Sequence, residues 1–429
     1  MQQILWGKLV LVLVAIVAIL QVVHLVLLSR LEARHHMHHH VHRTASNPGD
    51  GSDSQMTEVD AVFGTLVRTV EQGRVLDSSG EFQIVPSIAA ATKQPHPRGL
   101  IAATPDISLV TQCSFNHVYR LIELSQRWQG PISVAVFAED HQVSEALWKV
   151  AELRACMPGI RHNVTFALVS PLPAKSSPPL SMPSPPPPHP CSLGNDIDTV
   201  TTSTNYATTH NYPVNLLRNV ARRGTASEFV LVIDIDMLPN ENLRQDFFAF
   251  ASQRGLFRKR EHDEKNVFVV PAFEAKEDTP VPRHKAELLK LVEAGDVRPF
   301  YVQLCLKCQV HTDYESWQKE PPAPELAPLF EVLWKDPWEP FYIARNTIPF
   351  YDERFKQYGF NRISQVCELH VAGYKFSVLN NAFLVHRGVK THSSFHPEKD
   401  AELERNRMLF RQFKMELKSK YPESSRRCY

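Results

Sequence analysis

The segment at 229–239 constrains the fold of this chain more than any other stretch. Residues 229–233 form an apolar run that is mostly β-branched or aromatic, which is typical of a fully buried strand. Asp234 and Asp236 follow at its carboxyl end, and Pro239 is expected to end the strand. Because side chains alternate along a strand, a spacing of two places both carboxylates on one face. Two like charges this close repel unless a cation lies between them.

The position of this acidic pair predicts a metal-binding site. In open α/β sheets, ligands bind beyond the carboxyl ends of the strands. Carboxylate oxygens are the ligands that hard divalent cations prefer. The pair can therefore hold a divalent cation with coordination positions open for a phosphate-bearing substrate. The alternative is a solvated strand end at which both acids face water.

The patterning of the chain predicts an α/β fold. Strand-like runs and helical patterns alternate from 107 to 169, which is typical of parallel β-α-β units. Further strands are expected at 267–273, 338–343, 376–379 and 383–386. Further helices are expected at 212–221, 284–294, 361–372 and 398–420.

The amino-terminal part of the chain is predicted to lie outside the folded body. The apolar run at 9–28 is long enough to span a bilayer as a helix, and no small-residue cleavage site follows it. We therefore expect a short tail at 1–8, a transmembrane anchor at 9–28, a stem at 29–95 and a catalytic domain at 96–429. Basic residues flank the anchor on both sides and leave its orientation open. A proline-rich stretch at 171–190 is expected to be a surface insertion of polyproline character.

Charge and cysteine content restrict the partners and the compartment. The chain has 47 Lys and Arg against 46 Asp and Glu, so it has no field that attracts nucleic acid and no such partner is expected. Seven cysteines and a glycosylation sequon at Asn163 suit a luminal body in which disulfides form and at least one thiol stays unpaired. Cys305 and Cys308 have the spacing of a metal knuckle without a second pair, which favours a local disulfide or loop thiols over zinc.

Several long motifs make the chain resemble the nucleotide-sugar glycosyltransferases of family 49. The first, Asn-Tyr-Pro-Val-Asn-Leu-Leu-Arg from 211, leads into the acidic strand end. The others are Asp-Pro-Trp-Glu-Pro-Phe-Tyr from 336, Tyr-Asp-Glu-Arg-Phe from 351 and Glu-Leu-His-Val-Ala-Gly-Tyr from 368. They occur in order between roughly 99 and 428, with the proline-rich insertion as the main departure. The single catalytic domain resembles the single-domain members of this family.

The resemblance implies a fold, an activity and a location. The fold would be of GT-A type, a mixed and largely parallel sheet flanked by helices. The activity would be an inverting transfer of glucuronic acid from UDP-glucuronic acid to a xylose acceptor in β-1,4 linkage, with Mn²⁺ as cofactor. The product would prime matriglycan on the O-mannosyl glycans of α-dystroglycan. The protein would be a type II Golgi membrane protein with a luminal catalytic domain, and other Golgi glycosyltransferases such as LARGE would be possible partners.

The resemblance also assigns the metal and donor sites. Asp234 and Asp236 would hold Mn²⁺ against the diphosphate, since a metal clamp neutralises this leaving group without proton transfer. His386 resembles the carboxyl-terminal histidine that completes such sites, and its alternative role is a core histidine. The expected donor-binding residues share one helix face by their spacing or belong to the acidic pair: Asn215, Arg218, Asn219 and Asp234. The alternative for the first three is ordinary helix surface.

The donor's carboxylate and the acceptor's hydroxyl each require a further group. A glucuronate carboxylate calls for a cation. The candidates, which the sequence does not separate, are Arg218, Arg345, Arg387 and Lys390. An inverting transfer also needs a base for the acceptor hydroxyl. Many inverting GT-A enzymes have an acidic pair where this chain has Asn361 and Arg362, so the base must lie elsewhere.

Three acids are candidates for that base, namely Glu339, Asp352 and Glu368. Glu339 is favoured because it lies in the short strand expected at 338–343, whereas Asp352 and Glu368 have the alternative of solvated positions. Two other functions stay open. One is a β-1,3-N-acetylglucosaminyltransferase of poly-N-acetyllactosamine synthesis, and the other is a non-catalytic glycan-binding partner of Golgi transferases. The acidic pair argues against the second, because a binding protein has no need of two repelling acids.

Overall fold

The fold is described from a computed structural model that covers residues 51–93, 103–172, 180–181, 191, 210–257, 265–391 and 398–428, with side chains from residue 58 onward. The predicted tail and anchor, and most of the proline-rich insertion, lie outside these ranges. Within the described ranges, none of the helices combines the length and the apolar character that crossing a membrane requires.

The chain alternates between helices and strands over most of its length. The helices are α2 (Gly51–Gly73), η1 (Phe115–Arg120), α3 (Leu121–Trp128), η2 (Asp140–Gln142), α4 (Val143–Cys156), α5 (Pro158–Asn163), α6 (Val214–Arg223), α7 (Leu243–Gln253), α8 (Lys285–Glu293), α9 (Leu306–Gln309), η4 (Val310–Thr312), α10 (Tyr314–Lys319), α11 (Asn361–Val371) and α12 (Lys399–Lys420). The strands are β1 (Val75–Leu76), β2 (Phe82–Ala89), β3 (Thr104–Ser114), β4 (Ile132–Phe137), β5 (Val164–Pro171), β6 (Ser227–Val232), β7 (Met237–Pro239), β8 (Asn266–Val270), β9 (Ala272–Ala275), β10 (Val297–Pro299), β11 (Pro328–Val332), β12 (Phe341–Arg345), β13 (Lys375–Leu379) and β14 (Leu384–Arg387).

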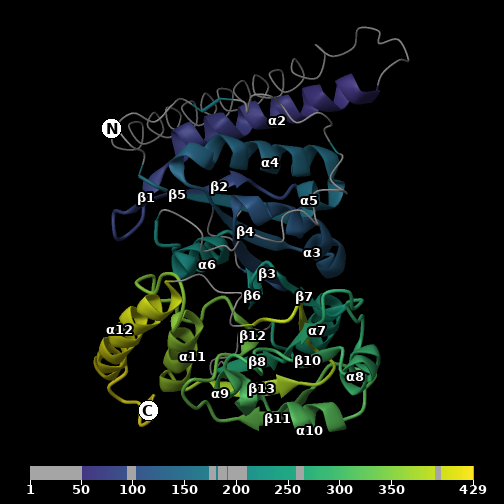
Figure 1. The fold of residues 1–429 in the computed structure, drawn as a ribbon, viewed down its shortest axis with the longest axis vertical. Coiled ribbons are helices and arrows are strands. Elements are labelled where there is room, and N and C mark those ends of the chain that lie inside the picture. The colour runs from purple at the N-terminus through teal and green to yellow at the C-terminus, as the bar shows by residue number, and fades with distance from the viewer. Residues whose placement is uncertain are drawn as a thin grey trace, which may run out of the picture. The chain divides into compact units, whose positions relative to one another are not determined.

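The main sheet has ten strands in the order β1-β2-β5-β4-β3-β6-β12-β8-β13-β11 (Figure 1). Its centre, from β5 through β4 and β3 to β6, is parallel, as the alternation of strands and helices predicts. β12 then runs antiparallel between β6 and β8, and both outer edges pair antiparallel as well. β8 and β13 pair parallel again beyond β12. The predicted mixed α/β sheet is confirmed, whereas parallel pairing is confined to the centre and to this one outer pair of the main sheet.

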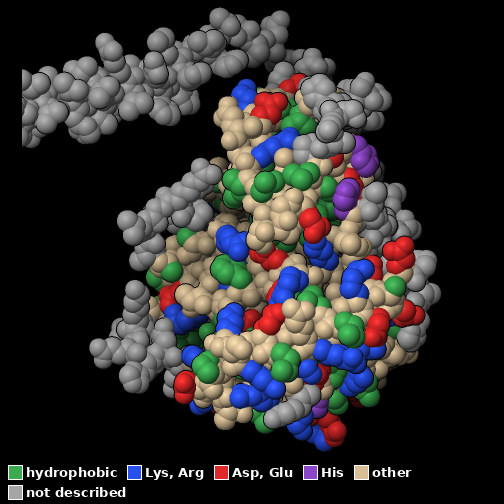
Figure 2. All heavy atoms as spheres, turned by 90° about the vertical axis from the view of Figure 1, so that its left-hand side faces the viewer, with side chains coloured by type: hydrophobic (Ala, Val, Ile, Leu, Met, Phe, Trp, Pro, Cys, Tyr) green, Lys and Arg blue, Asp and Glu red, His purple; other side chains and the backbone are tan. Residues whose placement is uncertain are grey.

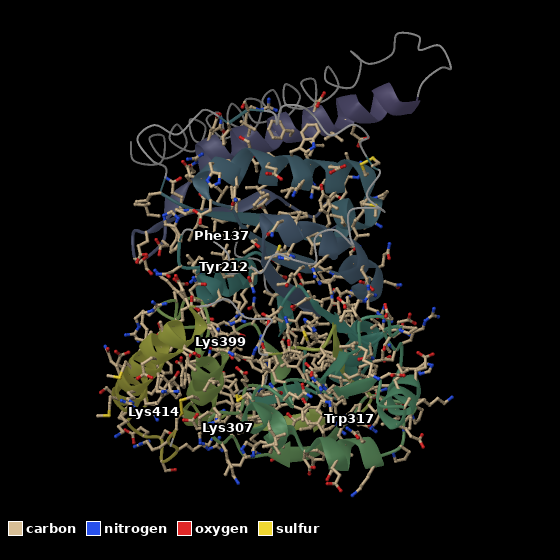
Figure 3. The ribbon with its side chains drawn as sticks, in the orientation of Figure 1. Phe137, Tyr212, Lys307, Trp317, Lys399 and Lys414 are labelled. Carbon is tan, nitrogen blue, oxygen red and sulfur yellow. A yellow bond between two sulfur atoms is a disulfide. The ribbon has the colours of Figure 1, made fainter. Side chains whose placement is uncertain are left out.

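The central strands are covered on both faces, which explains their continuous apolar sequences. Every residue of β4 and β5 is buried. On one face, α6 packs over alternate side chains of the sheet, and Phe137 meets Tyr212 edge to face at 5.3 Å (Figure 3). On the other face, α2, α3 and α4 share a core with the intervening side chains. The carboxyl ends of β3 and β6 therefore emerge from a sheet that is covered by helices on both faces.

The predicted stem at 29–95 is wrong from α2 onward. Four residues at helical spacing on this helix are buried, namely Val59, Phe63, Leu66 and Val70. The Phe63 ring lies 5.8 Å from that of Trp148 on α4, and β2 extends the main sheet beside β5. Because a polar stretch precedes this segment, its helical pattern was assigned to the stem, although the helix buries a full apolar face. Residues from α2 to β2 are thus part of the folded body.

Three disulfides lie within the described residues, joining Cys156 to Cys191, Cys305 to Cys308 and Cys367 to Cys428. Of the two alternatives left open for the Cys-x-x-Cys segment, a local disulfide and loop thiols, the structure has the disulfide. Cys113 is buried with a free thiol, in agreement with the expectation of an unpaired cysteine.

β6 ends at Val232, so the acidic pair lies in a turn and not on the strand. The Asp234 carbonyl accepts a hydrogen bond from the amide of Met237 at 3.0 Å, and β7 then enters a second, four-stranded sheet ordered β10-β9-β14-β7. A strand does end at Pro239, as expected, but that strand is β7, whose last residue pairs with Leu384. Because the chain turns between two sheets here, the two acids are free to face different partners.

Candidate active site

The second sheet brings Asp236 and His386 together. β14 pairs with β7 so that His386 lies opposite Met237, the residue after Asp236. The His386 Nε2 atom lies 3.0 Å from Asp236 Oδ2. Its Nδ1 atom lies 2.7 Å from the Gly388 carbonyl, which can only accept, so Nδ1 carries a proton. That bond fixes the ring and directs Nε2 at the carboxylate, the arrangement that second-shell bonds give to metal-binding histidines.

The electrostatics of Asp236 suit a cation. Burial alone would raise the pKa of Asp236, but Lys390 and His386 outweigh it and hold the pKa well below its usual value. Lys390 Nζ lies 3.2 Å from Asp236 Oδ2. The Asp236 side chain is 24% exposed, so a ligand can reach it. An ionised carboxylate and an imidazole nitrogen form a donor set that fits Mn²⁺.

Asp234 differs from its predicted role as a metal ligand. Its Oδ1 accepts from Arg218 Nη2 at 2.9 Å and its Oδ2 from Arg362 Nη2 at 2.8 Å. Burial alone would raise the pKa of Asp234, but the two guanidiniums keep it below its usual value. Across the described ranges no three acidic, histidine or cysteine side chains converge on one point. Of the three predicted ligands, only Asp236 and His386 contact each other, and Asp234 is paired with the two guanidiniums.

The helix that precedes β6 braces the site and does not face a ligand. Asn215 and Asn219 on α6 are at most 1% exposed, which contradicts their predicted contact with the donor. Asn215 Nδ2 donates to the carbonyls of Asp352 and Asn361, at 2.9 and 3.2 Å. Asn219 exchanges two hydrogen bonds with the backbone of Tyr351, at 2.8 and 2.9 Å. These amides thus fix the loop that leads into α11.

Arg218, also buried, connects this brace to the acidic turn. Its Nη1 donates to Asn215 and Asn361, both at 3.0 Å, and its Nη2 reaches Asp234. Asn361 thus accepts a hydrogen bond from Arg218, which holds Asp234, while Arg362 binds Asp234 directly. The lack of an acidic pair at these positions was visible in the sequence. Its consequence, a second guanidinium bound to Asp234, was not.

Glu339, the favoured base, lies among these charges. It is half-buried in the loop before β12, near enough to Arg362, Asp234 and Arg218 for their charges to act on it. The pKa of the Glu339 carboxyl is raised to about 7, because burial and the charge of Asp234 outweigh the opposing guanidiniums of Arg362 and Arg218. A carboxyl that titrates near neutrality is suited to general-base catalysis. Its amide donates to the Cys308 carbonyl at 3.0 Å, which anchors the loop to the Cys305–Cys308 disulfide.

The other two base candidates have structural contacts. Asp352 binds Arg354, with its Oδ2 accepting from Nη2 at 2.6 Å. Glu368 on α11 is 3% exposed and accepts from Lys420 Nζ at 2.6 Å and from the Tyr421 hydroxyl at 2.8 Å. These bonds dock the carboxyl-terminal helix. Neither acid is a base candidate in this structure, because neither has a free or poised carboxylate at the acidic turn.

The structure separates the cation candidates. Arg345 pairs with Glu228, and Arg387 pairs with Glu123 at 2.5 Å. Arg218 is occupied by Asp234. Lys390 alone of the four contacts Asp236 and is partly exposed. Two residues that were not predicted, Glu274 and Arg298, lie on strands of the same four-stranded sheet as His386. Their only signal in the sequence was a charged residue in a short β-strand.

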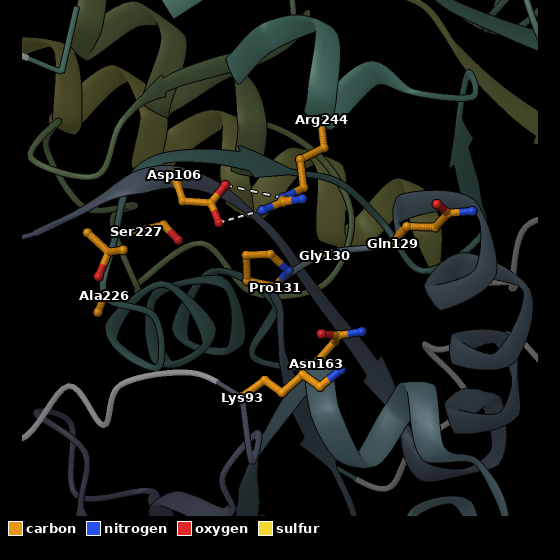
Figure 4. Close-up of a pocket in the computed structure, with 10 residues that line it drawn as sticks. Lys93, Asp106, Gln129, Gly130, Pro131, Asn163, Ala226, Ser227 and Arg244 are labelled. Carbon is orange, nitrogen blue, oxygen red and sulfur yellow. Dashed lines mark hydrogen bonds and ion pairs between the residues drawn. The ribbon is translucent and has the colours of Figure 1, made fainter. Parts of the chain in front are cut away.

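A separate pocket of about 320 Å³ lies at the other end of the central strands of the main sheet (Figure 4). Thr104 and Ser227, at the amino ends of β3 and β6, line it together with the Asp106–Arg244 ion pair. Asn163, the sequon residue, also lines it at the end of α5, and its glycosylation stays a prediction. Since the acidic turn follows the carboxyl end of β6, this pocket does not belong to the candidate active site.

On the face shown in Figure 2, basic and acidic side chains are interspersed, in keeping with a formal net charge of +1.

Comparisons with known proteins place the chain among enzymes. Residues 106–422 match the family described as "Glycosyl-transferase for dystroglycan". The chain is 41% identical over 383 residues to β-1,4-glucuronyltransferase 1 of Bos taurus, which covers 86% of this chain and 87% of that protein. The Homo sapiens protein of the same name is 40% identical over 381 residues, with the same coverage. Xylosyl- and glucuronyltransferase LARGE1 of Homo sapiens is 28% identical over 286 residues, covering 66% of this chain and 31% of that protein.

The family match spans β3 to α12 and so includes every residue of the candidate site. On this evidence, the chain belongs to glycosyltransferase family 49.

Proposed function

We propose that this chain is a GT-A type inverting glucuronyltransferase that moves glucuronic acid from UDP-glucuronic acid to a xylose acceptor in β-1,4 linkage. The observation that carries the proposal is the 41% identity, over 86% of the chain, to a protein named β-1,4-glucuronyltransferase 1. The site supports it independently, because a partly exposed Asp236–His386 pair lies in the same charged region as a carboxyl that titrates near neutrality.

The residues divide the work of an inverting transfer. Mn²⁺ held by Asp236 and His386 would neutralise the charge that develops on the diphosphate leaving group. Glu339, in its ionised form, accepts the proton of the acceptor hydroxyl as that oxygen attacks the anomeric carbon from the opposite side. Arg218 and Arg362 hold Asp234 ionised and rigid beside these groups. This division explains why the acidic pair can be absent at Asn361 and Arg362.

The cellular setting belongs to the same proposal. A transmembrane anchor at 9–28 would hold the chain in the Golgi membrane as a type II protein with its catalytic domain in the lumen. Three disulfides support an oxidising compartment. The description of the matched family supports α-dystroglycan as the carrier of the acceptor, on which the product would prime matriglycan. LARGE enzymes would then act on that product.

A donor panel tests the proposed activity. The purified chain is incubated with a xylose-terminated acceptor and, in turn, UDP-glucuronic acid, UDP-N-acetylglucosamine, UDP-glucose and UDP-xylose, with and without Mn²⁺. We expect transfer from UDP-glucuronic acid that requires the metal. Transfer from UDP-N-acetylglucosamine alone would support the N-acetylglucosaminyltransferase alternative, and the absence of transfer from every donor would support a non-catalytic role.

A further inference from the structure

A second charged cluster lies beside the Asp236–His386 pair on the four-stranded sheet. Glu274 on β9 is opposite His386 on one neighbouring strand and opposite Arg298 on the other. Residues that lie opposite each other in a sheet point to the same face. With neighbouring strands about 4.8 Å apart, Arg298 is two strands, or roughly 10 Å, from His386. This distance is comparable to the size of a sugar ring and its attached phosphate.

Glu274 organises the cluster. It is fully buried, and its Oε1 accepts from Arg298 Nε at 2.6 Å. Its Oε2 accepts from the backbone amide of Lys390 at 3.2 Å. A buried carboxylate is tolerated only when its oxygens are paired. Glu274 thus fixes the Arg298 side chain and anchors the backbone of Lys390 next to the Asp236–His386 pair.

Arg298 and Lys390 each have hydrogen-bond donor groups that remain available to a ligand. The Arg298 side chain is 27% exposed and uses only Nε for Glu274, while its Nη2 is buried without a hydrogen-bond partner among the described residues. The Lys390 side chain is also 27% exposed, and its Nζ contacts Asp236. An ammonium group has three donors, so this contact leaves two for a ligand. The cluster is therefore a partly open site for an anion.

We propose that Arg298 and Lys390, held by Glu274, bind the carboxylate of the donor sugar and thereby select glucuronic acid over neutral sugars. The inference rests on the proposed glucuronyl transfer, since it assumes a donor whose diphosphate lies at Asp236 and His386. A guanidinium fork and an ammonium group together match a carboxylate in charge and geometry. A sugar with a neutral hydroxymethyl group at the same carbon leaves both cations without that partner.

The test compares two donors that differ only at this carbon. The affinities of the full chain for UDP-glucuronic acid and UDP-glucose are measured by titration calorimetry with Mn²⁺ present, for the wild type and for Lys390→Gln and Arg298→Lys. We expect each variant to reduce the preference for UDP-glucuronic acid about tenfold or more, with little change for UDP-glucose. Because both donors have the same diphosphate, a loss of metal binding would weaken both and leave their ratio unchanged.

Lys276→Gln is the matched control, since Lys276 directly follows β9 but is exposed and pairs with Asp296. Its donor preference should equal that of the wild type. If the wild type transfers glucuronic acid and both cluster variants keep its donor preference within twofold, the inference is overturned and the proposed function stands. If the wild type transfers no glucuronic acid, the proposed function fails and the inference fails with it.

Discussion

Each carboxylate of the acidic turn is neutralised by its own cations. Asp234 is held by Arg218 and Arg362, whereas Asp236 contacts His386 and Lys390. Like charges in a turn would raise each other's pKa, yet both acids have a lowered pKa because these cations outweigh burial and repulsion. Both carboxylates are therefore ionised, and that of Asp236 is available to a metal ion.

Removing the charge of Asp236 should remove the metal site. We expect Asp236→Asn to lower the transfer rate at least 100-fold and to weaken Mn²⁺ binding measured by titration calorimetry, because a neutral amide is a poorer ligand for a hard cation. Its thermal unfolding should resemble that of the wild type, since the residue is partly exposed. The control is Asp296→Asn, which changes an exposed acid. Near-wild-type turnover of Asp236→Asn would contradict the metal assignment.

The protonation of Glu339 should determine how the rate depends on pH. A base acts only when ionised, and burial raises the pKa of this carboxyl to about 7. We therefore expect kcat to rise with pH between about 6 and 8 and then to level off. Glu339→Gln should lose 10²–10⁴-fold in kcat with little change in KM for the donor, whereas Glu331→Gln, an exposed change on β11, should have no effect. A Glu339→Gln enzyme with wild-type kcat would exclude this residue as the base.

The Glu339 carboxyl should lower the free energy of unfolding at high pH. Its pKa in the folded protein lies above the ordinary carboxyl value of 4.5, so between about pH 4.5 and 7 the folded state binds more protons than the unfolded state. Stability contributed by this group is therefore present at low pH and lost as pH rises through this window. Unfolding of Glu339→Gln, followed by denaturant titration, should show a stability gain over wild type at pH 8 that disappears at pH 4. An equal difference at both values would show that the carboxyl is not perturbed.

At the scale of elements, α6 is a brace between β6 and the loop at 351–361. The spacing of Asn215, Arg218 and Asn219 was visible in the sequence, and their shared helix face was predicted correctly. Which way that face points depends on contacts with residues more than 130 positions away, such as Tyr351 and Asn361. Local periodicity has no information about such contacts, so the ligand-facing interpretation was wrong for the two asparagines.

Asn219 provides the test of this structural role. Asn219→Ala leaves the backbone groups of Tyr351 without their partner, and we expect a loss of about 1–3 kcal/mol in the free energy of unfolding. The donor KM of the remaining folded enzyme should change less than threefold, since the side chain does not reach a ligand. If Asn219→Ala had unchanged stability and a strongly raised donor KM, the predicted contact of Asn219 with the donor would be supported.

At the scale of the whole molecule, the sequence predicted the elements better than their arrangement. The alternation expected from 107 to 169 is confirmed, with β4 at 132–137 as one of its strands, and the helix expected at 361–372 is confirmed within one residue. These segments have continuous apolar or strongly periodic sequences. The insertion of β12 between β6 and β8 was not predictable, since strand order depends on long-range pairing. The acidic turn was misplaced onto a strand for a related reason: the four-stranded sheet that accepts β7 is assembled from distant segments.

The amino-terminal boundary of the folded body is open to a direct test. Leu66 on α2 is 2% exposed within the core that α2, α3 and α4 share. We expect Leu66→Ala to lower the free energy of unfolding by about 2–5 kcal/mol. The exposed neighbour change Glu71→Ala should alter it by less than about 0.5 kcal/mol. If both changes had equal, small effects, α2 would belong to the stem and not to the folded body.

The structure of the reaction product tests the central proposal most directly. The purified chain, Mn²⁺, UDP-glucuronic acid and a xylose-terminated acceptor are incubated together, and the isolated product is analysed by mass spectrometry and NMR. We predict one added hexuronic acid, β-linked to O4 of the xylose, which reports both the transferred sugar and the inversion that requires a base. An α-linked glucuronic acid, a product with an added N-acetylhexosamine instead, or an unmodified acceptor would contradict the account.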